Sequence, residues 1–184
     1  DPLLGNDGTI IQSEKGVNFL LQHDNNKGHK FLTGFEYRQP DLIKATNQRF
    51  GAQVQGINPS VLVNTENHRN FRGLYAQYQA PISSNTQYIV GGRYDDISDS
   101  GSHFSPRLGL IHQVDDANTL KLLYGEAFRA PSRIETDVKN NPVLLGNPDL
   151  KSEVSKTLEV LWIYMTEQQL LSTTLFNTHI NDPI

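Results

Sequence analysis

The sequence predicts an all-β fold, a segment of an antiparallel up-and-down transmembrane β-barrel. Three observations indicate this class: long segments of alternating apolar and polar residues, connections that alternate between short and long, and a polar average composition. Mean hydropathy is −0.49, and no run of about 18 apolar residues is present to form a transmembrane helix. A barrel strand that points apolar residues outward and polar residues inward averages to such a composition.

Eight segments alternate with a period of two or have a β-rich composition, and each is about 9–13 residues long. Ordinary strands are about 5–6 residues long, whereas a tilted strand that crosses a bilayer needs about 9–11. A period of two favours strands over helices. In chain order the predicted strands are 16–24, 29–38, 70–80, 86–96, 104–114, 118–128, 154–164 and 168–180.

Within these segments the apolar side chains share one face. In order, the apolar positions are Phe31, Phe35 and Tyr37, then Tyr88, Val90 and Tyr94, then Leu108 and Leu110, then Leu120, Leu122 and Tyr124, then Leu158, Val160, Trp162 and Tyr164. The opposing positions are Lys30, Glu36 and Arg38, then Arg93 and Asp95, then Arg107 and Gln113, then Lys121 and Gly125, then Thr157 and Glu159. A slip of one residue would exchange the faces, so the register is strongly specified.

The connections alternate in length. Residues 25–28, 81–85, 115–117 and 165–167 form short turns, and residues 39–69, 97–103 and 129–153 form longer loops. Outer-membrane barrels have short periplasmic turns and longer extracellular loops. Aromatic residues near the strand ends, such as Tyr37, Tyr78 and Trp162, resemble the aromatic girdles of such barrels.

A second interpretation remains open at this point: a soluble all-β ligand-binding module, a lectin-like sandwich, whose apolar face would pack on another sheet. Other classes are disfavoured. A net charge of −4 gives no basic field for nucleic acid. The chain has no cysteine, and its six histidines show no metal-ligand spacing. Ser132 lacks a nucleophile elbow. We therefore expect that the protein is not an enzyme and that it has neither a metal site nor a cofactor.

Three stretches carry a family resemblance: "GGRYDD" at 91–96, "FSPRLGLIHQVDDANTLKLLYGEAFRAPS" at 104–132 and "GNPDLKSEVSKTLEV" at 146–160. In order and spacing they resemble the barrel of TonB-dependent outer-membrane receptors. The resemblance is strong over 86–184 and weaker over 1–85. It implies that residues 1–184 are part of a barrel of the 22-stranded, plugged type, with the plug domain absent from this sequence.

The resemblance also implies a function. Such receptors bind a scarce ligand outside a Gram-negative cell, most often a ferric siderophore, and import it with energy from TonB. The implied partners are a small-molecule ligand, outer-membrane lipid and the TonB complex, which would be reached through an N-terminal region.

Two groups of residues are candidates for the site. Ferric siderophores are often anionic, so arginines near the outer mouth could steer them; the candidates are Arg69, Arg72, Arg129 and Arg133. The second group, which the resemblance places in the lumen or in the family motifs, is Arg93, Asp95, Arg107, Lys121, Pro131, Asn147, Pro148, Glu153 and Glu159. We expect its charged members to pair with one another or with the plug, in a hydrated wall.

Overall fold

The computed structural model describes residues 5–50, 60–61, 68–138 and 145–184, which form one antiparallel sheet. The strands are β1 (Gly5–Asp24), β2 (Lys30–Phe50), β3 (Ser60–Val61), β4 (Phe71–Ser83), β5 (Thr86–Ile97), β6 (Gly101–Gln113), β7 (Asn118–Arg129), β8 (Glu153–Met165) and β9 (Leu170–Asn181). A short helix, α1 (Arg133–Asp137), lies between β7 and β8. Within the described ranges, no helix is long and apolar enough to cross a membrane.

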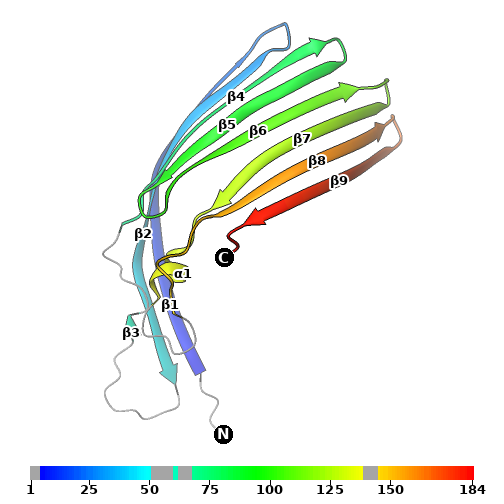
Figure 1. The fold of residues 1–184 in the computed structure, drawn as a ribbon. Coiled ribbons are helices and arrows are strands. Elements are labelled where there is room, and N and C mark those ends of the chain that lie inside the picture. The colour runs from blue at the N-terminus through cyan, green and yellow to red at the C-terminus, as the bar shows by residue number, and fades with distance from the viewer. Residues whose placement is uncertain (1–4, 51–59, 62–67, 139–144) are drawn as a thin grey trace.

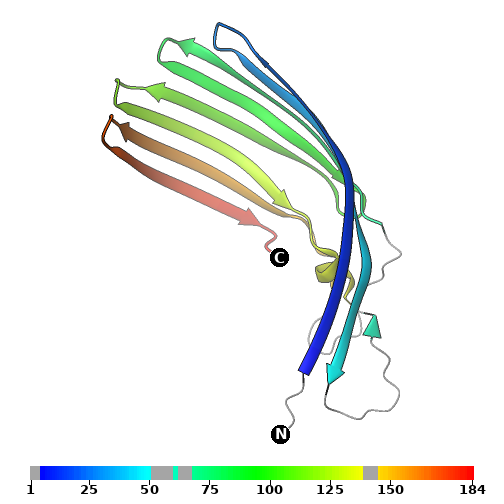
Figure 2. The same cartoon turned by 180° about the vertical axis from the view of Figure 1, so that it is seen from behind.

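The sheet is a single curved layer, as Figure 1 and the reverse view in Figure 2 show. Its long strands follow chain order, β1-β2-β4-β5-β6-β7-β8-β9, and β3 pairs with β2 outside this path. The all-β, up-and-down prediction is confirmed. In the described part of the chain no second sheet covers either face, and the buried apolar side chains are only Ala80, Ile97, Pro131 and Val138. The sandwich interpretation is therefore unsupported.

The predicted faces and register are confirmed. Leu110, Leu122 and Val160 lie opposite one another on three adjacent strands, as do Leu108, Tyr124 and Leu158. These rows lie on the convex face of the sheet, and their aliphatic side chains are exposed; Leu122, for example, is 45% exposed. The charged positions fall on the concave face. A broad exposed apolar surface of this kind requires a covering medium.

The prediction that residues 39–69 form a loop was wrong for 39–50 and for 60–61, which form β3. The predicted longer loop over 97–103 was also wrong, because β6 begins at Gly101, directly after a three-residue connection from β5. Residues 39–50 continue β2, paired with β1 as far as Gly5 opposite Phe50. Pro40 favoured a strand end in the sequence because proline cannot donate to a ladder. Here the pairing of β2 with β4 ends at Arg38, so Pro40 lies on a strand that has lost its second long neighbour and tolerates the missing donor. The predicted loop residues 51–59 and 62–67 lie outside the described residues.

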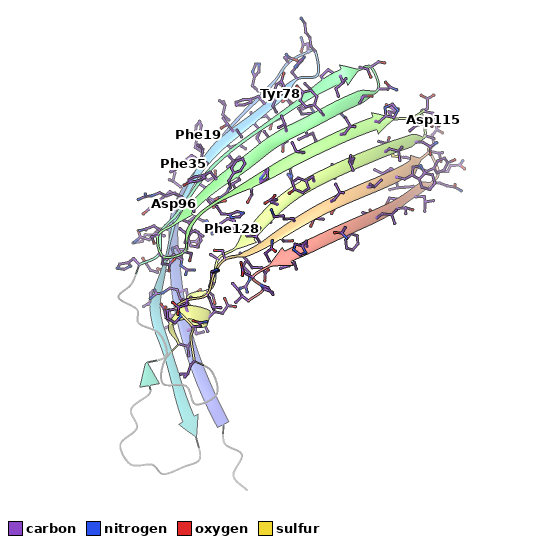
Figure 3. All side chains as sticks on the ribbon, in the orientation of Figure 1. Phe19, Phe35, Tyr78, Asp96, Asp115 and Phe128 are labelled. Carbon is purple, nitrogen blue, oxygen red and sulfur yellow. The ribbon has the colours of Figure 1, made fainter. Side chains whose placement is uncertain are left out.

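The short turns lie together at one end of the sheet, where Figure 3 shows Asp115. The Asp115 carboxylate accepts the backbone N–H groups of Ala117 at 2.9 Å and Asn118 at 2.8 Å, and the Asn118 side-chain amide at 2.9 Å. The amide of Asn118, followed by these two backbone donors, lowers the pKa of Asp115 below its usual value. An acceptor at this position fixes the turn between β6 and β7.

We predict that Asp115→Ala destabilises the protein at neutral pH because three donors lose their acceptor. The folded pKa is depressed, so the contribution of the carboxylate is present above the unfolded value of about 3.9 and is lost as pH falls through the folded pKa. Urea unfolding of the reconstituted protein at pH 7 and under acid conditions measures this effect.

The matched control is Asp115→Asn, which keeps a side-chain oxygen for the turn and removes the titration. The difference between wild type and Asp115→Ala should shrink on acidification. A difference that stays constant over this pH range would contradict the role given to the carboxylate.

Candidate functional site

A hollow of about 880 Å³ lies on the concave face, toward the end of the sheet opposite the short turns. Strands β2, β4, β5, β6, β7 and β8 contribute to it. Because side chains alternate along each strand, the residues that line it are mostly the polar partners of the convex apolar rows. Its charged and aromatic lining consists of Glu36, Arg38, Arg69, Phe71, Tyr75, Arg93, Asp95, Arg107, Glu126 and Phe128.

Four of these side chains form an ion network. Arg93 Nη2 lies 2.8 Å from Glu36 Oε2 and 2.7 Å from Asp95 Oδ1. Arg38 Nε lies 2.5 Å from Glu36 Oε1. The two carboxylates are mostly shielded from solvent, with 22% and 13% of their side chains exposed. Two positive and two negative charges balance, so the network joins β2 to β5 without leaving a net charge.

Glycine makes this network possible. Gly73 on β4 lies between Glu36 on β2 and Asp95 on β5 in the register. A Cβ at Gly73 would meet the Arg93 guanidinium and would lie 2.9 Å from Asp95 Oδ1. The Arg93 side chain can therefore cross β4 to reach Glu36 only because position 73 has no side chain. One row away, the Tyr75 ring occupies the space above Gly34 in the same manner.

Guanidinium groups and aromatic rings lie together in the hollow. Arg93 Cζ is 5.6 Å from the centre of the Tyr75 ring, and Arg38 Cζ is 4.9 Å from that of Phe71. Such cation–π contacts hold both groups in place. Arg107 is different: it is exposed, and its side chain has no ion pair or hydrogen bond with any part of the chain that the structure describes. The hollow can therefore offer a free positive charge beside aromatic surfaces to an anionic molecule.

Three of the four arginines predicted to contact ligand, Arg69, Arg129 and Arg133, lie at the connection after β7, where Arg69 bonds the Pro131 carbonyl. Arg69 lines the hollow but is only 7% exposed. Arg72 lies on the convex face, 3.8 Å from Asp96. Arg129 bonds Glu135 at 3.1 Å, and Arg133 lies 3.5 Å from Asp137. Direct ligand contact by these residues stays a prediction.

The predicted lumen group lies as its register requires, but its pairing is partial. Arg93 and Asp95 pair with each other, and Glu153 accepts the backbone N–H of Ile184 at 3.2 Å. Arg107, Lys121 and Glu159 lie on the concave face without a partner among the residues described. Alternation in the sequence places Glu36 and Arg38 on the polar face, but neither residue was among the predicted site residues. Their pairing with Arg93 depends on the register of three strands.

The connection between β7 and β8 is more ordered than its sequence suggests. Ser132 caps α1 by accepting the Glu135 N–H at 3.3 Å, and Glu135 Oε2 accepts the Ser132 N–H at 2.7 Å. This capping box was readable from the Ser-x-x-Glu spacing. The Ser132 donors and the Arg129 guanidinium hold the pKa of Glu135 below its usual range. The predicted return at Asn147 donates its N–H to the Glu135 carbonyl at 2.8 Å.

Pro131 and Gly146 fit this connection closely. Pro131 is fully buried where the chain leaves β7, and Pro148 starts a turn after Asn147. A Cβ at Gly146 would lie 2.5 Å from the Thr136 carbonyl oxygen, so only glycine fits against α1 there. The connection thus forms a compact unit that adjoins the outer end of the hollow. Residues 139–144 of the predicted loop lie outside the described residues.

We predict that Gly73→Ala disrupts the Arg93–Glu36 pair, because the added methyl group occupies the path of the guanidinium. Overpacking of this kind costs about 1–3 kcal/mol of unfolding free energy. Gly125→Ala is the matched control, since nothing lies within 4 Å of a Cβ at Gly125 on the same face. Thermal and denaturant unfolding of both variants measures the difference. Equal losses in the two variants would show that the crossing at Gly73 is not required.

The sequence is similar to that of known proteins. The profile of the family described as "TonB dependent receptor-like, beta-barrel" matches residues 4–184. The chain is 37% identical over 109 residues to the "Iron-regulated outer membrane virulence protein" of Vibrio cholerae, covering 56% of this chain and 17% of that protein. It is 23% identical over 197 residues to the "Ferrienterobactin receptor" of Escherichia coli K12, covering 97% of this chain and 26% of that protein.

Solved structures agree on the fold. The siderophore receptor PirA from Acinetobacter baumannii superposes with a TM-score of 0.70 at 19% identity, covering 96% of this chain and 28% of that one. A mutant of the ferric enterobactin receptor PfeA from Pseudomonas aeruginosa, in complex with enterobactin, gives a TM-score of 0.69 at 19% identity, covering 94% of this chain and 27% of that one. This chain therefore spans less than a third of the relatives that it matches. With a family profile matched along almost its whole length, the chain belongs to the TonB-dependent receptor-like β-barrel family.

Proposed function

We propose that the protein to which this chain belongs binds a ferric siderophore at the cell surface and imports it with energy supplied through TonB. The observation that carries the proposal is the contrast between two faces of one sheet. A continuous apolar convex face backs a concave hollow that holds guanidinium groups and aromatic rings. As a member of this receptor family, the chain is an outer-membrane barrel segment of a Gram-negative bacterium and not an enzyme.

The convex face is suited to lipid. Its apolar rows are exposed, and aromatic residues with polar tips flank them near the short turns. Tyr78 bonds His29 at 2.6 Å through its hydroxyl, and Trp162 Nε1 donates to Asn118 at 2.9 Å. Aromatic rings with one apolar body and one polar tip favour the membrane–water interface. We infer that outer-membrane lipid covers this face.

The hollow is suited to an anionic ligand. The arginines hold their charge at every physiological pH, and Arg107 has no partner in the described ranges. The aromatic rings of Phe71 and Tyr75 lie beside the ion network and offer flat apolar surface. A ferric complex that carries negative charge and planar groups fits both features. The names of the relatives favour a siderophore over other scarce ligands.

We predict that Leu122→Arg on the convex face destabilises the whole receptor in lipid by about 2–4 kcal/mol, because a cation near the bilayer midplane is poorly solvated. Leu123→Arg is the matched control: it changes the next residue, on the concave face, where Glu159 lies opposite. Unfolding of both variants in lipid vesicles measures the free energies. A larger loss for Leu123→Arg would reverse the assignment of the two faces.

We predict that deletion of the whole receptor gene abolishes uptake of radiolabelled ferric enterobactin by iron-starved cells, while cobalamin uptake is unchanged. A plasmid copy should restore uptake, and a copy with Arg129→Gln and Arg133→Gln should restore it poorly at low ligand concentration. Uptake assays at limiting and saturating ligand separate these cases. Loss of cobalamin uptake with iron uptake intact would overturn the siderophore assignment.

A further inference from the structure

The main-chain ladder between β6 and β7 ends halfway along the strands. Its last pair is Arg107 with Gly125. On one side, β5 and β6 remain paired as far as Ile97 with Gly101, and on the other, β7 and β8 remain paired as far as Arg129 with Glu153. The outer parts of these two strands, residues 101–106 of β6 and 126–129 of β7, therefore have no pairing between them. We refer to this unpaired boundary as the seam.

The sequence explains why pairing stops there. Pro106 follows directly beyond the last pair and has no N–H to donate to a ladder. On β7, the Glu126 carboxylate accepts the Tyr124 hydroxyl and lies 3.3 Å from Lys156 Nζ on β8, so its partners lie away from β6. The hollow reaches both sides of the seam, since Ser105 and Ala127 both line it.

Side chains close the seam where the ladder does not. The rings of His103 on β6 and Phe128 on β7 lie with their centres 4.8 Å apart. Arg69 makes the stronger connection. Its Nε donates to Asp99 Oδ2 at 2.7 Å, and its Nη1 donates to the Pro131 carbonyl at 2.8 Å. Asp99 lies in the β5–β6 connection and Pro131 just after β7, so one buried guanidinium joins both sides.

We propose that Arg69 is a positioning residue that holds the seam closed and so sets the shape of the outer half of the hollow. A guanidinium can donate in two fixed directions at once, which an ammonium group on a lysine stem cannot reproduce. Loss of Arg69 would leave the Pro131 carbonyl and the Asp99 carboxylate without this donor. The effect on ligand affinity rests on the proposed function, whereas the effect on the seam does not.

The test uses the whole receptor in lipid, with spin labels on cysteines introduced in place of Ser102 and Ala127, one on each side of the seam. A second pair replaces Gln113 and Thr119, which face each other in the paired part of β6 and β7. The present sequence contains no cysteine, so this region adds no background labelling. Distance distributions are measured without ligand for wild type, Arg69→Gln, Arg69→Lys and Arg72→Gln.

We expect Arg69→Gln to broaden and lengthen the distance across the seam while the paired control distance stays unchanged. Arg69→Lys should give an intermediate result. Arg72→Gln, which removes an exposed arginine from the convex face, should give the wild-type distance across the seam. The Kd for ferric enterobactin should rise about tenfold in Arg69→Gln.

An unchanged seam distance in Arg69→Gln would overturn the proposal. If that variant fails to fold, Asp99→Asn weakens one arm of the connection at a more exposed position, and an unchanged distance there would likewise overturn it. A wild-type receptor that binds no ferric enterobactin would contradict the choice of ligand alone, because the distance measurement needs none. A longer seam distance with unchanged Kd would overturn the link between Arg69 and the shape of the hollow.

Discussion

The proposed contact with lipid places one constraint on the rest of the structure: backbone N–H and C=O groups at membrane depth must bond to neighbouring strands. Long antiparallel ladders meet this requirement and alternate the side chains between faces. The convex apolar rows and the concave polar hollow are therefore two consequences of the same pairing. Beyond the last β6–β7 pair, the ring contact between His103 and Phe128 and the two hydrogen bonds of Arg69 join the two sides instead.

Two glycines in the strands leave space on the concave face for side chains from neighbouring strands. At Gly73 the missing side chain lets Arg93 cross a strand to Glu36, and at Gly34 it leaves space for Tyr75. The ion network consequently lies flat against the sheet, and the volume above it stays open for ligand. The Arg107 guanidinium has no partner among the described residues, whereas the charged side chains near it form ion pairs with one another. An unpaired positive charge in a hollow is the electrostatic arrangement that attracts an anionic ligand.

Much of the fold was predictable because alternation is a local property. The strands, their faces and the antiparallel order followed from period and turn spacing. The extension of β2 beyond Pro40 could not be predicted in this way. A segment that contains a proline and alternates only weakly between apolar and polar residues looks like a loop in the sequence. In the site, the convex position of Arg72 could have been read from its parity with Leu74, and the capping box from Ser132 and Glu135. The burial of Arg69 between Asp99 and Pro131 depends on contacts across 62 residues of chain, which no local pattern reports.

The central claim is that one sheet separates lipid on its convex face from water and ligand on its concave face. The most direct measurement is a spin-label scan of residues 118–128 in the whole receptor in lipid vesicles, with oxygen and a water-soluble nickel complex as relaxation agents. We expect accessibility to alternate with a period of two: oxygen should reach even positions such as 120 and 122, and odd positions such as 121 and 123 should be shielded from it. Accessibility to oxygen that is equal at odd and even positions would contradict it.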